Sequence, residues 1–253
     1  MTTRRDAIAT IGTGLLALAG CGRDSSVTAP TVDGAGRLTV RPRTPDTPLA
    51  PGATVIEPTF GIIGYAYVPT SYRPSQPAPA SLVLHGGGEP AASLIESLLP
   101  MAEASGEVLL AIGSSDVTWD LVRHGAFGAD IPTLNKGLGW LFDRVVVDPA
   151  RLGVLGFSDG ATYALALGRA NGDLFRRVVA YSPGALAPVT QVGTPQFYIT
   201  HGTEDDVFAV AQTRDGIVPL LRSAGYQVEY HEFAGGHGIP EDLEVASIAW
   251  IAR

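Results

Sequence analysis

The chain has 253 residues, of which 45% are hydrophobic and 17% are charged, so its apolar share is enough for one sizeable core. Its single cysteine excludes disulfides within the chain and the cysteine clusters that hold zinc or iron–sulfur groups. With 17 basic against 25 acidic residues, the net charge is −8. A protein with a net negative charge does not neutralise the phosphates of a nucleic acid, so we expect no nucleic-acid partner.

Residues 1–20 have the pattern of an export signal. Arg4 and Arg5 precede an apolar stretch over residues 8–19, which is shorter than the roughly 20 residues that a membrane-spanning helix needs. The stretch ends in a Leu-Ala-Gly-Cys sequence that resembles the bacterial lipoprotein signal, in which the cysteine becomes the first mature residue and carries the lipid. The resemblance implies export and a lipid anchor on Cys21 in the bacterial cell envelope. The paired arginines also resemble a twin-arginine export signal. The alternative is a buried N-terminal helix with an incidental thiol.

Residues 21–52 are rich in proline, threonine and serine, a composition that favours an extended tether over a packed core. Within it, Leu38-Thr39-Val40 predicts a short first strand. We assign residues 53–253 to one domain, because no internal repeat and no second linker interrupts them.

From about residue 54, apolar runs that favour strands alternate with helical spacing. The runs predict strands at 65–68, 81–84, 108–112, 152–157, 177–181, 195–200 and 227–233. Helices are predicted at 91–105, 131–146, 159–170, 208–224 and 241–252. This alternation indicates an α/β fold, with a mostly parallel sheet covered by helices on both faces. In such a sheet, functional groups gather in the loops at the carboxyl ends of the strands.

One such loop carries the sequence Gly156-Phe157-Ser158-Asp159-Gly160, which matches the pattern G-x-S-x-G. It lies between a predicted strand and a predicted helix, so Ser158 would stand on a sharp turn with its hydroxyl raised above the sheet. The glycines on either side leave room for the neighbouring backbone. The alternative is a glycine-rich turn in which the serine only caps a helix.

On these motifs the chain resembles the α/β-hydrolases, near the esterases and depolymerases of the phospholipase/carboxylesterase and dienelactone-hydrolase type. The resemblance covers most of residues 38–253. Besides the Ser158 turn, it rests on Tyr67-Val68-Pro69-x-x-Tyr72-x-Pro74, Leu84-His85-Gly86-Gly87-Gly88, Asp148-Pro149-x-Arg151, His201-Gly202-x-x-Asp205 and Gly235-Gly236-His237. It implies an α/β-hydrolase fold and a Ser-His-Asp catalytic triad.

A serine hydroxyl needs a base to become a nucleophile, and the base needs a carboxylate to orient it. In this fold their order along the chain is serine, acid, histidine. That order leaves His237, in a glycine loop, and His231, on a predicted strand; we favour His237. The resemblance indicates Asp205 as the acid, with Asp206 as the alternative.

A second interpretation of the segment around Asp205 is a metal site. His201, Glu204, Asp205 and Asp206 have plausible spacing for ligands, but no second histidine cluster joins them. We therefore expect neither a metal nor an organic cofactor.

The oxyanion formed during attack on a carbonyl requires backbone N–H donors. We expect one from Asp159, directly after the nucleophile. For the other the resemblance indicates Gly87, with Gly88 as the alternative, unless the loop is a plain glycine turn. Trp119 follows the 108–112 strand and would line the substrate pocket or simply pack in the core. Three further residues have similar positions: Phe157, Ser182 and Phe208.

The sequence therefore predicts a lipid-anchored serine esterase that acts through an acyl-enzyme on short-to-medium acyl or aromatic esters. No inserted segment is long enough for a large lid, which suggests an accessible cleft. A polyester depolymerase on the same fold would differ mainly in an open, aromatic-lined groove. A serine peptidase would usually need an added domain, for which the length leaves no room. The non-catalytic alternative is a lipoprotein that keeps this fold only as a binding module.

Overall fold

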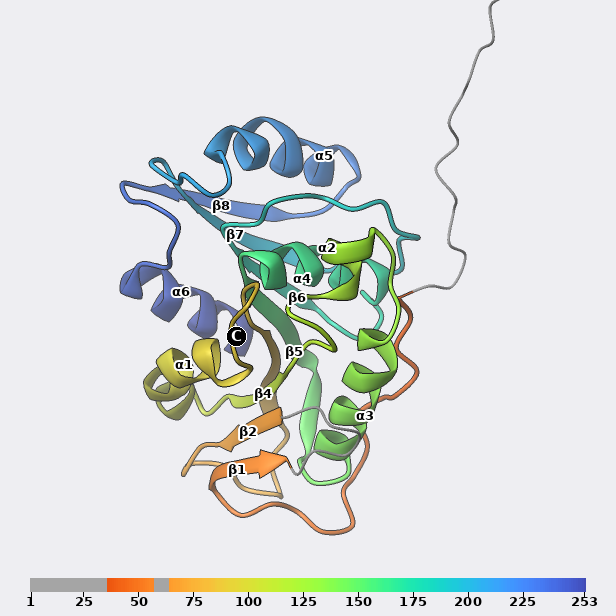
Figure 1. Cartoon of the computed structure of the whole chain (residues 1–253). Coiled ribbons are helices and arrows are strands. Elements are labelled where there is room, and N and C mark those ends of the chain that lie inside the picture. The colour runs from red at the N-terminus through yellow and green to blue at the C-terminus, as the bar shows by residue number, and fades with distance from the viewer. Residues whose placement is uncertain (1–35, 57–63) are drawn as a thin grey trace, which may run out of the picture. The chain divides into compact units, whose positions relative to one another are not determined.

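The computed structural model describes residues 36–56 and 64–253. They form one eight-stranded sheet (Figure 1) in the order β1-β2-β4-β3-β5-β6-β7-β8. Strands β3 to β8 run parallel to one another, whereas β2, which pairs with β4, and β1 are antiparallel additions at one edge. In chain order the strands are β1 (Gly52–Ile56), β2 (Gly64–Val68), β3 (Ala78–Leu84), β4 (Val108–Ile112), β5 (Val147–Phe157), β6 (Arg177–Tyr181), β7 (Gln196–Gly202) and β8 (Val228–Phe233).

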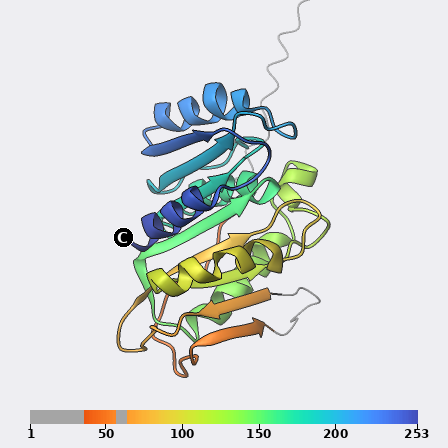
Figure 2. The same cartoon turned by 90° about the vertical axis from the view of Figure 1, so that its left-hand side faces the viewer.

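Helices cover both faces of this sheet, as a mostly parallel sheet requires. They are α1 (Ala92–Ser105), α2 (Asp120–His124), α3 (Asp130–Phe142), α4 (Asp159–Ala170), α5 (Val218–Ser223), which directly follows the π-helical turn η1 (Gln212–Ile217), and α6 (Glu241–Ala252). Helices α1 and α6 lie together in front of the sheet in Figure 2. Their apolar side chains join one core cluster, and those of α3, α4 and α5 join the other.

Most of the expected elements are present. Every strand predicted between residues 65 and 233 forms, with ends that differ by a few residues. The expected 208–224 helix is instead split into η1 and the short α5. Strand β1 and helix α2 were not predicted; α2 has only five residues, less than two helical turns and too few to show a helical period.

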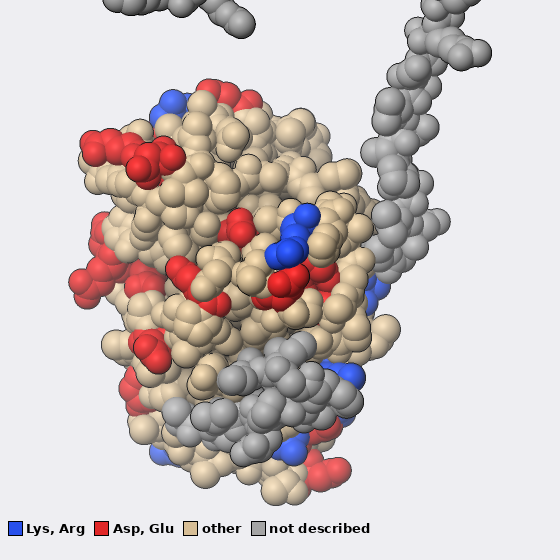
Figure 3. Space-filling model, viewed as in Figure 1, with Lys and Arg blue, Asp and Glu red and all other residues tan. Residues whose placement is uncertain are grey.

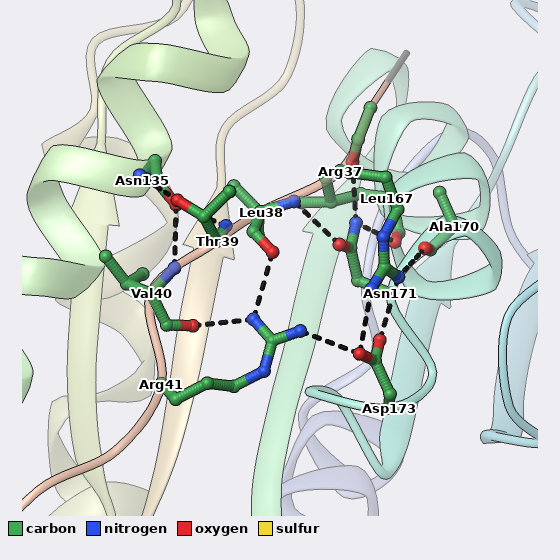
Figure 4. A network of polar contacts seen from close by, with 11 residues as sticks. Arg37, Leu38, Thr39, Val40, Arg41, Asn135, Leu167, Ala170, Asn171 and Asp173 are labelled. Atoms are coloured by element: carbon green, nitrogen blue, oxygen red, sulfur yellow. Dashed lines mark hydrogen bonds and ion pairs between the residues drawn. The ribbon is translucent and has the colours of Figure 1, made fainter. Parts of the chain in front are cut away.

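Residues 36–41, here called the strap, differ from the expected tether, because they pack against the domain (Figure 4). Leu38 is only 1% exposed and belongs to the larger core cluster. Its N–H donates to Oδ1 of Asn171 at 2.8 Å, and Nδ2 of Asn171 donates to the carbonyl of Gly36 at 2.7 Å. Asn135 accepts from the N–H groups of Thr39 and Val40.

The short strand expected at Leu38–Val40 is therefore wrong: these backbone groups bond to amide side chains of α3 and of the end of α4, not to a neighbouring strand. Outside the core, Arg37 and Arg41 both pair with Asp173, at 2.8 and 2.7 Å. The hydrogen bonds from these guanidinium groups hold the pKa of the Asp173 carboxyl well below its usual range.

The expected signal and Cys21 lie outside the described residues. Within 36–56 and 64–253, no helix combines the length and the apolar character needed to cross a bilayer.

Candidate active site

The site is built around the turn between β5 and α4. Ser158 has φ 57° and ψ −119°, a conformation that L-residues rarely adopt, and its N–H donates to the carbonyl of Tyr181 on β6 at 2.9 Å. A Cβ at Gly156 would overlap the backbone of Gly160, and one at Gly160 would overlap the carbonyl of Leu84. The two glycines thus allow the backbone approach that the strained turn needs.

His237 connects Ser158 to Asp205. Its Nε2 lies 2.9 Å from Oγ of Ser158, and its Nδ1 lies 2.7 Å from Oδ2 of Asp205. The three residues come from loops that follow β5, β8 and β7, so the parallel strands bring them to one edge of the sheet. The carboxylate can only accept, which assigns the proton to Nδ1 and leaves Nε2 free to accept from the serine hydroxyl.

The Asp205 carboxylate is fully buried yet well supplied with donors. Oδ1 accepts from the N–H groups of Val207 and Phe208, at 2.9 and 2.8 Å. Burial acts to raise the pKa of this carboxyl, but the hydrogen bonds from His237 and from the two N–H groups outweigh burial and lower it. Asp205 is therefore the ionised partner of His237, whereas Asp206 is exposed.

His231 lies elsewhere on the sheet. Its Nε2 is 3.0 Å from Glu229, and its ring lies 4.9 Å from that of Tyr198. Tyr198 belongs to the core cluster on the α1 and α6 face, so His231 is not part of this site.

The loop after β3 lies against Asp159, the residue that follows the nucleophile. The N–H of Gly88 already donates to the carbonyl of Val117 at 2.7 Å, so it is not available to an oxyanion. Across residues 36–56 and 64–253, the N–H groups of Gly87 and Asp159 have no hydrogen-bond acceptor. A Cβ at Gly87 would overlap the Asp159 carboxylate, so a larger residue at this point would have to displace that side chain.

The carboxylate of Asp159 was not anticipated as a feature of the site. Oγ1 of Thr118 donates to its Oδ2 at 2.7 Å. The side chain of Glu89 also folds onto this loop, accepting from the N–H of Gly86 at 3.1 Å. Figure 3 shows more acidic than basic side chains on the described part of the face turned toward the viewer, consistent with the net charge of −8.

Aromatic rings surround His237. The ring of Phe157 lies 4.8 Å from the imidazole, and that of Phe208 lies 5.5 Å from it and is nearly perpendicular. Trp119, by contrast, is completely buried, and its Nε1 donates to the carbonyl of His85 at 2.9 Å. Of the two interpretations left open for Trp119, the structure supports packing beneath the loop. Ser182 is also fully buried.

His85 links two loops at this edge. Its Nδ1 donates to the carbonyl of Gly86 at 2.7 Å, while its Nε2 accepts from the N–H of Ser114 at 3.0 Å. Both ring nitrogens are thereby used in holding the glycine loop.

The metal interpretation finds no support in the geometry. In the described part of the chain, no three or more His, Cys, Asp or Glu side chains are arranged to hold a metal ion. Of the four residues considered, Glu204 and Asp206 are exposed, whereas His201 is fully buried beside Asp205.

No protein-family model and no curated protein matches this sequence. Solved structures do resemble it in backbone. An S-formylglutathione hydrolase from Staphylococcus aureus superposes with a TM-score of 0.63 at 13% identity, covering 79% of this chain and 99% of that one. The Bacillus cereus carboxylesterase gives a TM-score of 0.59 at 20% identity, covering 76% and 94%. Esterase 2 of Thermogutta terrifontis gives 0.59 at 19% identity, covering 81% and 93%.

At such identities the likeness concerns the fold. Together with the sheet order and the strand-to-helix turn at Ser158, it shows that the chain has the α/β-hydrolase fold.

Proposed function

We propose that the protein is a serine carboxylic-ester hydrolase. The observation that carries this proposal is the continuous hydrogen-bonded chain from Asp205 through His237 to Ser158, with distances of 2.7 and 2.9 Å. A serine aligned with a base that is itself oriented by a buried carboxylate is the arrangement that activates a hydroxyl.

In the first step, Oγ of Ser158 attacks the ester carbonyl while Nε2 of His237 takes its proton. Asp205 stabilises the imidazolium that forms. The free N–H groups of Gly87 and Asp159 stabilise the oxyanion. The tetrahedral intermediate then collapses, the C–O bond to the alcohol breaks, and His237 returns the proton to the departing oxygen. Water repeats the sequence on the acyl-enzyme and releases the acid.

Short-to-medium acyl or aromatic esters are the proposed substrates. Phe157 and Phe208 offer apolar surface next to the base, and Val117 and Val207, in loops at this edge of the sheet, are 61% and 58% exposed. Structures of the Thermogutta terrifontis esterase have been described with butyrate and with propionate bound, and another after phosphorylation by paraoxon.

The test is hydrolysis of p-nitrophenyl esters of increasing acyl length by the purified protein. We expect Ser158→Ala to remove activity by about 10⁴-fold or more, while Ser115→Ala, at an exposed serine in the loop after β4, leaves the rate unchanged. Equal rates for Ser158→Ala and the unaltered protein would refute the assignment. Lack of turnover of any ester by a folded protein would favour the binding module.

We further propose that Cys21 carries the lipid of an exported, membrane-anchored protein, on the strength of the sequence pattern alone. Mass spectrometry of the protein made in a lipoprotein-processing bacterial host tests this. The expected species lacks residues 1–20 and carries acyl chains on Cys21, whereas an intact N-terminus with an unmodified thiol would contradict it.

A further inference from the structure

His201 is a completely buried histidine that the proposed mechanism does not use. It lies near the end of β7, four residues before Asp205. A buried imidazole needs partners for both ring nitrogens, and the partners of His201 lead to the triad.

Both nitrogens are engaged. Nε2 donates to the backbone carbonyl of Phe208 at 2.8 Å and lies 3.1 Å from Oδ2 of Asp205, the same oxygen that contacts His237. Nδ1 lies 2.8 Å from Oγ1 of Thr213, a fully buried residue of η1. Because the Phe208 carbonyl can only accept, it assigns a proton to Nε2. In the neutral ring Nδ1 then accepts from the Thr213 hydroxyl, whose other neighbour, the carbonyl of Pro183, lies farther away at 3.4 Å.

Phe208 connects His201 to both Asp205 and His237. Its N–H donates to Oδ1 of Asp205 at 2.8 Å, and its ring meets the His237 ring edge-on at 5.5 Å. By holding the carbonyl of Phe208, His201 fixes a residue that touches both the acid and the base. One imidazole thus contacts both the acid and the residue whose N–H donates to that acid.

We propose that His201 is a positioning residue of the triad: through Nε2 it holds Phe208 and Asp205 against His237, while its Nδ1 accepts from Thr213. The inference rests on the proposed function, because it concerns the same triad. The cost of losing such an anchor lies in the alignment of the base, since a displacement of about 1 Å at a catalytic group lowers rates by about 100-fold.

The charged surroundings of His201 are few. Across the sheet its partner in register is Glu232 of β8, which is paired with Arg214 of η1 at 2.5 Å. On its own side it faces Asp205. The variants below leave these charged groups in place. A shift in the pH dependence of the His201 variants is therefore attributed to the loss of the imidazole.

Two matched pairs of variants test the proposal in the full-length protein. His201→Leu removes both nitrogens, whereas His201→Gln keeps an N–H donor near the position of Nε2. Thr213→Val removes the hydroxyl that donates to Nδ1, whereas Thr213→Ser keeps it. Circular dichroism and thermal unfolding select the variants that fold.

We expect His201→Leu to lower kcat by about 10- to 100-fold with KM changed less than about 2-fold, because alignment and not substrate binding is lost. Thr213→Val should lower kcat less, and His201→Gln and Thr213→Ser should restore most of it. The acidic limb of the kcat/KM profile should move to lower pH in His201→Leu, because a displaced Asp205 stabilises the His237 imidazolium less. Unchanged kcat and an unchanged acidic limb in folded His201→Leu would overturn the proposal. So would equal losses in His201→Leu and His201→Gln with no shift of that limb.

A readout without substrate separates this proposal from the proposed function. The low-field proton NMR resonance of Nδ1–H of His237 reports its hydrogen bond to Asp205 whether or not esters are turned over. We expect it to be present in the unaltered protein and in His201→Gln, and lost or shifted in His201→Leu. If that pattern holds in a protein that hydrolyses no ester, the esterase proposal fails and the positioning role stands; an unchanged resonance in His201→Leu contradicts the positioning role alone.

Discussion

Two buried carboxyl groups lie at opposite ends of the parallel strands and differ in charge. Asp205, beyond the carboxyl end of β7, accepts hydrogen bonds from His237 and from two backbone N–H groups, and its pKa is lowered. Glu107 directly precedes β4. Oε1 accepts from the hydroxyl of Ser81, while Oε2 has no partner among the described residues.

Burial therefore raises the pKa of Glu107 to about 8, although the hydrogen bond from Ser81 acts to lower it. Glu107 is the more completely buried of the two residues and has one donor, whereas the Asp205 carboxylate has three. Burial and the number of donors therefore act together: the site end of the sheet favours an ionised carboxylate, and the opposite end favours a neutral carboxylic acid.

The largest expected effect comes from removing the charge at the site end. Asp205→Asn should lower kcat/KM for a p-nitrophenyl ester by about 10⁴-fold, because an amide cannot hold the imidazole in the required tautomer or stabilise the imidazolium. Asp206→Asn, at the exposed neighbour, is the matched control and should change the rate less than about 2-fold. If Asp206→Asn lowered kcat/KM more than Asp205→Asn does, Asp206 and not Asp205 would be the acid.

The neutral carboxyl at the opposite end predicts a dependence of stability on pH. The unfolded Glu107 ionises near pH 4.5 and the folded one only near 8, so its contribution to stability is full below about pH 4.5 and is lost as pH rises to about 8. Over that window we expect the unaltered protein to lose roughly 2–4 kcal/mol more free energy of unfolding than Glu107→Gln. Urea unfolding at pH 5 and pH 8 measures this, and parallel changes in both proteins would show that Glu107 ionises normally.

The strap provides a test of stability that is separate from the site. Leu38→Ala should lower the free energy of unfolding by about 2–4 kcal/mol, because it removes a buried side chain from the larger core cluster. The kcat of the folded fraction should stay unchanged. Thr39→Ala, which removes an exposed hydroxyl that accepts from Nδ2 of Asn135 at 3.1 Å but no core side chain, is the control and should cost about 1 kcal/mol or less. Equal stability of the two variants would mean that residues 36–41 do not pack as described.

The smallest expected effect concerns the second carboxylate of the site. Asp159 lies against Gly87, so we expect it to disfavour substrates that carry a negative charge. Asp159→Asn should raise the rate on an ester with a terminal carboxylate by about 3- to 10-fold relative to a neutral ester of equal length, with a smaller gain at high salt. Asp215→Asn, an exposed residue of η1, removes one charge as well and should leave that ratio unchanged.

The sequence predicted those parts of the molecule in which a local motif lies directly after a predicted strand. The turn at Ser158 was predicted because a strand, two flanking glycines and a helix stand next to one another in the chain. His237 and Asp205 were favoured because each follows a predicted strand, and the structure brings both to Ser158.

The features that the sequence did not predict depend on contacts between residues far apart in the chain, or on side chains that contact several groups at once. Nothing near Leu38 indicates that Asn171, beyond the end of α4, accepts its N–H, so a proline-rich composition suggested a tether. The bond from Thr118 to Asp159 joins the loop after β4 to the first residue of α4. His201 belonged to a motif, but only the fold shows that its Nε2 reaches Phe208 and Asp205.

Covalent labelling of Ser158 tests the central claim most directly. The purified protein is treated with a fluorophosphonate, and the intact mass and the modified peptide are measured for the unaltered chain, Ser158→Ala and His237→Ala. We predict a single adduct on Ser158 in the unaltered chain, none in Ser158→Ala, and labelling slowed by orders of magnitude in His237→Ala. Labelling of Ser158→Ala to the same extent, or no labelling of a folded, unaltered protein, would contradict the account.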